Sequence, residues 1–60
     1  MKLLVLHDFT NPERIVPIDP DSFAMAAPYL SGGLVYTKDR EGGQLVYETP
    51  ERIAELIGAL

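Results

Sequence analysis

Residues 34–48, LVYTKDREGGQLVYE, decide the fold. Leu34–Thr37 is rich in β-branched and aromatic residues, which is the composition of a strand, and Gln44–Glu48 is similar. The six residues between them, 38–43, are polar and end in two glycines. Because a loop of this kind joins antiparallel neighbours, we predict a β-hairpin at residues 34–48.

A second hairpin is predicted at the start of the chain. Lys2–His7 holds four consecutive aliphatic residues, too few for a helix, and Asp8–Pro12 supplies turn chemistry. Arg14–Ile18 is the expected partner strand, although Pro17 has no N–H donor and fits only an edge or a bulge. Since a strand with one wet face alternates, we expect both faces of Lys2–His7 to be buried, centrally or by another subunit.

The segment between the hairpins starts like a helix. Asp19 can cap free amides, and Pro20 has the dihedral angle of a first helical residue. Phe23–Leu30 then fits both a helical and a strand pattern, and Pro28 interrupts either one. We favour one helical turn followed by extended chain, and we place a glycine turn at Ser31–Gly33.

A closing helix is predicted after Thr49-Pro50-Glu51, which combines a capping hydroxyl, a proline at the first helical position and an acid in the first turn. The sequence thus predicts one α+β domain, residues 1–60, with about four antiparallel strands in two hairpins, one short helical turn and an amphipathic C-terminal helix. Four aliphatic side chains share one stripe of that helix and should cover the sheet: Ile53, Leu56, Ile57 and Leu60.

Composition narrows the classes of function. The chain of 60 residues has no cysteine, one histidine and a net charge of −4. Disulfides and thiolate zinc sites are excluded, and the charge has the wrong sign for binding a nucleic-acid backbone. The longest apolar run, residues 3–6, is far shorter than the roughly 20 residues of a membrane span. We expect a cytoplasmic protein without membrane insertion or cofactor.

Two polar groupings are candidate sites of chemistry. His7 and Asp8 suggest a base held by a carboxylate, but adjacent strand residues point to opposite faces, so we expect both to be solvated. Asp19 and Asp21 resemble part of a cation site, yet no further ligands follow, and both fit a helix start. We therefore predict no catalytic, cofactor-binding or metal-binding residue.

The order of these signals resembles the small flagellar and swarming-motility proteins of the FlbD type. Residues 18–23, Ile-Asp-Pro-Asp-Ser-Phe, stand where that family carries an apolar residue, Asn-Pro-Asp and another apolar residue. Residues 47–53 stand where it carries a strand end, Glu-Ser and the start of a helix. The resemblance covers residues 15–60 and departs at residues 8–12, where the family has a shorter turn. It implies a shared fold and an accessory role in bacteria.

We expect a non-enzymatic accessory protein that forms homo-oligomers and binds another protein. A domain this small gains only roughly 3–5 kcal/mol from its own core, and self-association is the support that this composition leaves open. The rival hypothesis is a small metal-dependent or enzymatic protein with His7, Asp8, Asp19 and Asp21 at a subunit interface. The expected contact elements are residues 3–6 and a strand edge that contains Val16 or Leu34. The expected interface residues are Leu4, Leu6, Val16 and Leu34.

Overall fold

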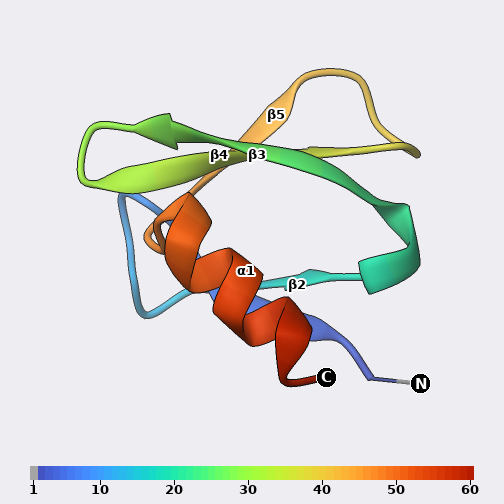
Figure 1. Cartoon of the computed structure of the whole chain (residues 1–60). Helices are drawn as coiled ribbons and strands as arrows, with labels where there is room; N and C mark the ends of the chain where they lie inside the picture. The colour runs from blue at the N-terminus through green and yellow to red at the C-terminus, as the bar shows by residue number, and fades with distance from the viewer. Residues whose placement is uncertain (1) are drawn as a thin grey trace.

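A computed structural model describes residues 2–60 and confirms the α+β class. A two-stranded and a three-stranded antiparallel sheet lie one below the other, and the C-terminal helix crosses in front of the space between them (Figure 1). The elements are β1 (Leu4–His7), β2 (Ile15–Ile18), the 3-10 helix η1 (Pro20–Ser22), β3 (Phe23–Tyr29), β4 (Gly32–Thr37), β5 (Gly43–Val46) and α1 (Pro50–Gly58).

The predicted hairpins are confirmed, but the predicted count of four strands is wrong. β1 pairs with β2 and β4 with β5, as expected, whereas the extended chain after η1 is a fifth strand, β3, paired with β4. Pro28 does not prevent this pairing because β3 lies at the edge of its sheet, where a missing N–H donor is tolerated. The strands form two sheets, in the orders β1-β2 and β3-β4-β5.

The predicted turn at Ser31–Gly33 is also wrong in part. The β3–β4 turn consists of Leu30 and Ser31, and the two following glycines are buried inside β4. A Cβ atom on Gly33 would lie 2.7 Å from the backbone oxygen of Glu48. Glycine is needed here for close backbone approach rather than for a turn.

The two sheets are joined where β1 and β5 end. The Tyr47 N–H donates to the His7 carbonyl oxygen at 2.8 Å, and Asp8 forms an isolated antiparallel bridge with Val46. The strand order therefore continues from the three-stranded sheet into β1 over a short distance. This join brings residues 46–48 beside the end of β1 and directs the chain toward α1.

One face of β1 is buried, not two. Leu4 and Leu6 are inside the core, while Val5 between them is 46% exposed. The alternation arises because the chain has only one layer to pack on β1, and that layer covers a single face. The expectation that both faces are buried within one chain is therefore wrong.

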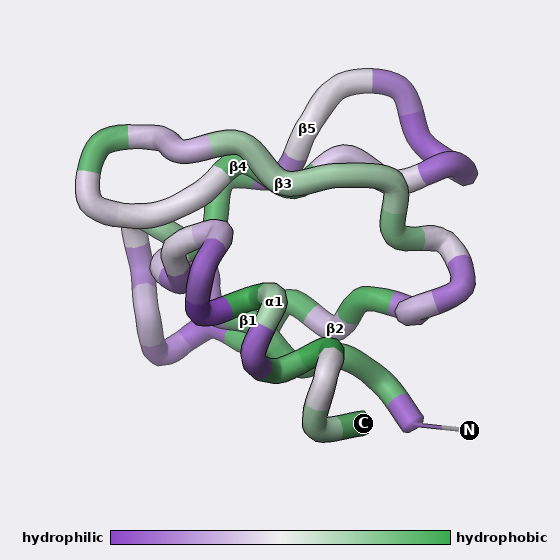
Figure 2. Tube along the Cα trace, in the orientation of Figure 1, coloured by the Kyte–Doolittle hydropathy of each residue, from purple (hydrophilic) through white to green (hydrophobic). Residues whose placement is uncertain are grey.

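The core between the layers is aliphatic. Thr49 caps α1 by accepting from the Arg52 N–H at 3.2 Å, and Ile53 on this helix is fully buried. Leu56 and Ile57 pack partly against the core, but Leu60 follows the helix and is exposed, so the predicted stripe is one residue too long. Figure 2 shows hydrophobic segments gathered where β1, β2 and α1 meet. The buried side chains are Leu4, Leu6, Ile18, Val35, Val46 and Ile53.

The first prediction concerns the core. Leu6→Ala should destabilise the fold by about 2–5 kcal/mol, because truncating a fully buried leucine loses burial and leaves a cavity. That cost is close to the roughly 3–5 kcal/mol expected of so small a core, so the variant should be largely unfolded. Urea denaturation followed by far-UV circular dichroism measures the loss. Val5→Ala, on the exposed face of the same strand, is the control and should cost far less. Equal losses would contradict the assignment of the buried face.

Leu30 has a costly conformation at the tip of the β3–β4 hairpin. Its φ angle of 49° lies in the left-handed region, and its side chain is 82% exposed. The left-handed conformation costs roughly 1–2 kcal/mol for a residue with a Cβ atom. Because the Leu30 side chain is so exposed, its contacts with the rest of the chain do little to offset that cost.

The second prediction is that Leu30→Gly stabilises the fold. Relief of the left-handed strain exceeds the added flexibility of the unfolded chain, so the free energy of unfolding should rise by about 0.5–1 kcal/mol. Leu30→Ala keeps the strain and should leave stability nearly unchanged. Thermal and urea denaturation of the three proteins compare them directly. A glycine variant less stable than the wild type would show that the leucine side chain contributes to the fold.

Candidate functional site

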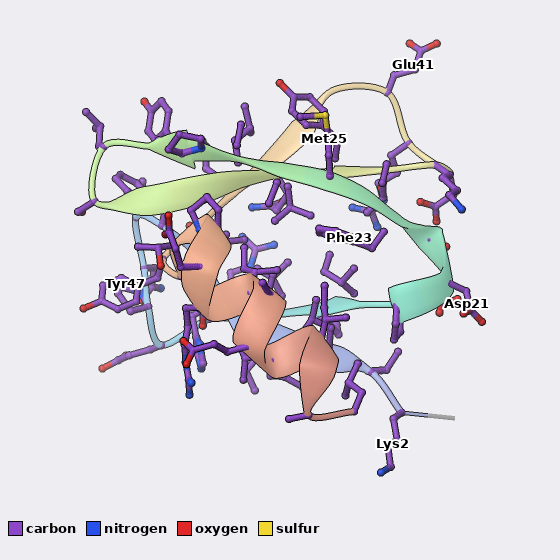
Figure 3. The ribbon with its side chains drawn as sticks, in the orientation of Figure 1. Lys2, Asp21, Phe23, Met25, Glu41 and Tyr47 are labelled. Atoms are coloured by element: carbon purple, nitrogen blue, oxygen red, sulfur yellow. The ribbon has the colours of Figure 1, made fainter. Side chains whose placement is uncertain are left out.

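The three-stranded sheet has one face turned away from α1, which we call the outer face. Cross-strand pairs place Ala27 beside Leu34 and Leu34 beside Leu45. Figure 3 shows Met25 above the sheet and Phe23 on its other side, toward the second layer. Residues two apart in a regular strand point to the same face. A register irregularity between Phe23 and Met25 allows their side chains to point to opposite faces of the sheet. Six apolar or aromatic side chains share the outer face: Met25, Ala27, Tyr29, Leu34, Tyr36 and Leu45.

Along the described strands β3, β4 and β5, no charged residue belongs to the outer face. Its remaining strand positions are Gly32 and Gly43. Side chains of β4 lie next to the exposed Gly43: a Cβ there would be 2.5 Å from Leu34 Cδ1 and 3.3 Å from the Tyr36 ring. Antiparallel sheets with a solvated face normally carry polar residues on it. The outer face therefore has the composition of a covered surface.

An aromatic pair extends the outer face at its hairpin end. The ring of Phe9, from the turn after β1, packs edge-on against the ring of Tyr29, with centroids 5.3 Å apart and planes at 79°. Such a pair is worth about 0.5–1.5 kcal/mol beyond its burial. The β4–β5 loop lies at the other end and carries the alternating charges of residues 38–41, all exposed. The apolar surface is thus bounded by charge at that end.

A second arrangement links β1 to the segment before α1. The Glu48 carboxylate accepts from the His7 N–H at 2.9 Å, and its second oxygen lies 2.5 Å from His7 Nδ1. The Glu48 side chain is only 10% exposed. The His7 side chain is 43% exposed, so it is solvated as expected, but its pairing with Glu48 was not predicted. A separation of 41 residues explains why no local pattern in the sequence indicated this pair.

The His7–Glu48 pair borders a shallow depression of about 460 Å³. A carboxylate on Nδ1 fixes the orientation of an imidazole, an arrangement common in catalytic and metal sites. Within residues 2–60, Glu48 is the only side chain that hydrogen-bonds to His7, and the pair ties β1 to the segment before α1. The depression is lined by His7, Ser31, Tyr47, Glu48, Thr49 and Arg52.

The acidic residues weighed for chemistry have local roles. Asp8 accepts from the Thr10 N–H at 2.9 Å, and this hydrogen bond lowers the pKa of Asp8 below its ordinary value of 3.8, with a further contribution from the Thr10 hydroxyl. Asp19 accepts from the Asp21 N–H at 3.0 Å and caps η1, as predicted. Across residues 2–60, no group of three or more acidic or histidine side chains is arranged to hold a metal ion.

The four expected interface residues are separated by the fold. Leu4 and Leu6 belong to the core of the single chain, and Val16 packs partly against it. Leu34 lies on the outer face, but on the central strand of its sheet, so the expectation of a free edge at this residue is wrong. The interface itself stays a prediction. The sequence found one member of the outer face and missed its neighbours on β3.

Comparison with known proteins identified no relative of this chain. No family model matches the chain, and neither the curated proteins nor the solved structures contain a match. The resemblance to FlbD-type proteins therefore stays a prediction. In the described part of the chain, α1 and η1 are both too short to cross a bilayer.

The third prediction tests the link between β1 and α1. Glu48→Ala should lower the free energy of unfolding by about 1–3 kcal/mol, because it leaves the half-buried His7 N–H without this acceptor. Glu48→Gln keeps an acceptor oxygen and should lose less. Glu41→Ala, in the exposed β4–β5 loop, is the control and should stay within about 0.5 kcal/mol of the wild type. Equal stability of the Glu48→Ala and Glu41→Ala variants would remove the pair from the account of the fold.

Proposed function

We propose that this chain is a non-enzymatic accessory protein that acts through self-association and protein binding. The outer face carries this proposal, because six neighbouring side chains on it are uncharged and two of them, Met25 and Tyr29, are exposed. Met25 on this face is 52% exposed. Contiguous apolar patches on small proteins commonly mark contacts with other macromolecules.

The small size of the domain supports the same proposal. Among residues 2–60, the buried core consists of six aliphatic side chains, and a sequence without cysteine has no disulfide to add stability. Binding of any partner to the folded state alone raises its apparent stability by mass action. A protein of this size gains both function and stability from such a contact.

The proposed setting is the cytoplasm, with no nucleic acid as partner. A net charge of −4 opposes binding to phosphate backbones, and the resemblance to FlbD-type proteins over residues 15–60 supports an accessory role in bacteria. The rival proposal, a small metal-dependent or enzymatic protein, requires a second subunit to complete a site around His7. Both proposals depend on association between chains, but only the first makes the outer face itself the functional surface.

The fourth prediction is the mass in solution. Size-exclusion chromatography with light scattering should give a mass above the 6.6 kDa of one chain at high concentration, with a decrease on dilution. The physical reason is mass action on a contact made by exposed apolar surface. A mass of 6.6 kDa from low micromolar to millimolar concentration would contradict self-association.

A further inference from the structure

We infer that a second copy of this chain covers the outer face, with the two three-stranded sheets packed face to face about a two-fold axis. The inference rests on the proposed function and names the partner and the surface. A two-fold contact brings the same patch of both subunits together, so the patch must complement itself.

Charge limits the surfaces through which two copies can meet. Each chain carries a net charge of −4, so most modes of association would bring acidic groups together. The strands of the outer face contribute no charged side chain, and contact between two such faces creates no like-charge pair at its centre. A strongly charged partner would find no opposite charge on this surface.

The size of the outer face distinguishes it from the other exposed apolar surface. Strands lie about 4.8 Å apart and rise about 3.3 Å per residue, so the seven, six and four residues of β3, β4 and β5 span about 270 Å² in plan. The exposed face of β1 and β2, which carries Val5 and Ile15, has two strands of four residues and spans about 130 Å². The larger surface offers more than twice the area for burial.

Pairing along the free edge of β3 is the alternative way to join two copies. A proline lacks the N–H that such pairing needs, and β3 contains Pro28. A register irregularity near Phe23 disturbs the other end of the strand. Prolines and bulges are the devices by which edge strands avoid pairing with other chains. The edge of β3 therefore disfavours strand pairing between two copies, which leaves packing of one sheet face against the other.

The area also sets the strength of the contact. A standard interface buries about 800 Å² on each partner, well above the plan area of the outer face. Phe9 and the exposed Leu30 enlarge the surface at the hairpin end but do not close that difference. The dimer should be weak and reversible, with dissociation in the range between micromolar and millimolar concentration.

The fifth prediction uses paired charges at the centre of the outer face. Leu34→Lys and Leu34→Glu should each be monomeric at a concentration where the wild type is dimeric, because each places like charges in contact across the axis. An equimolar mixture of the two variants should recover the dimer mass. Sedimentation equilibrium of the full chain measures all three samples, and far-UV circular dichroism confirms that each variant is folded.

Two further variants keep the test decisive. Met25→Lys changes a side chain that is already 52% exposed, so it should weaken the dimer at least tenfold while the chain stays folded, and it serves if Leu34 variants unfold. Val5→Lys, on the face of β1, is the matched control and should leave the dimer intact. Loss of the dimer in the Val5 variant with retention in the Met25 variant would overturn this inference while self-association stands. A wild-type chain that stays monomeric would overturn both.

Discussion

The join between the ends of β1 and β5 is the constraint on which the rest of the structure depends. The Tyr47 N–H bonds to the His7 carbonyl, and the Glu48 carboxylate reaches the amide and ring of the same residue. These contacts hold the two sheets at a distance that Ile53 of α1 can fill. Without them, a helix of nine residues would have no enclosed space to cover.

Local chemistry in the sequence predicted much of the fold. Turn residues and β-branched runs located both hairpins, and the Thr49-Pro50 signal located α1. The sequence did not predict β3 as a strand, because its pattern has no clear period and Pro28 argues against a central strand. The structure places β3 at the edge of the sheet, where a proline is tolerated. The contact between His7 and Glu48 depends on the tertiary fold and leaves no local pattern.

The outer face was predictable only in fragments. Leu34, Val35 and Tyr36 are all apolar, so the sequence does not reveal which face of β4 the core covers. The structure decides it: Val35 faces the core, and its two neighbours face outward. The apolar run at residues 3–6 predicts a partner on the first strand, whereas the larger exposed apolar surface belongs to the three-stranded sheet.

The placement of the aromatic side chains has a consequence for spectroscopy. The core is aliphatic, the sequence contains no tryptophan, and Tyr29 and Tyr47 are exposed while Tyr36 is half-buried on the outer face. Tyrosine emission therefore comes from side chains outside the aliphatic core. Two of its three sources lie where a second molecule would change their contact with water, so this intrinsic signal reports what covers the sheet, and amide signals report folding.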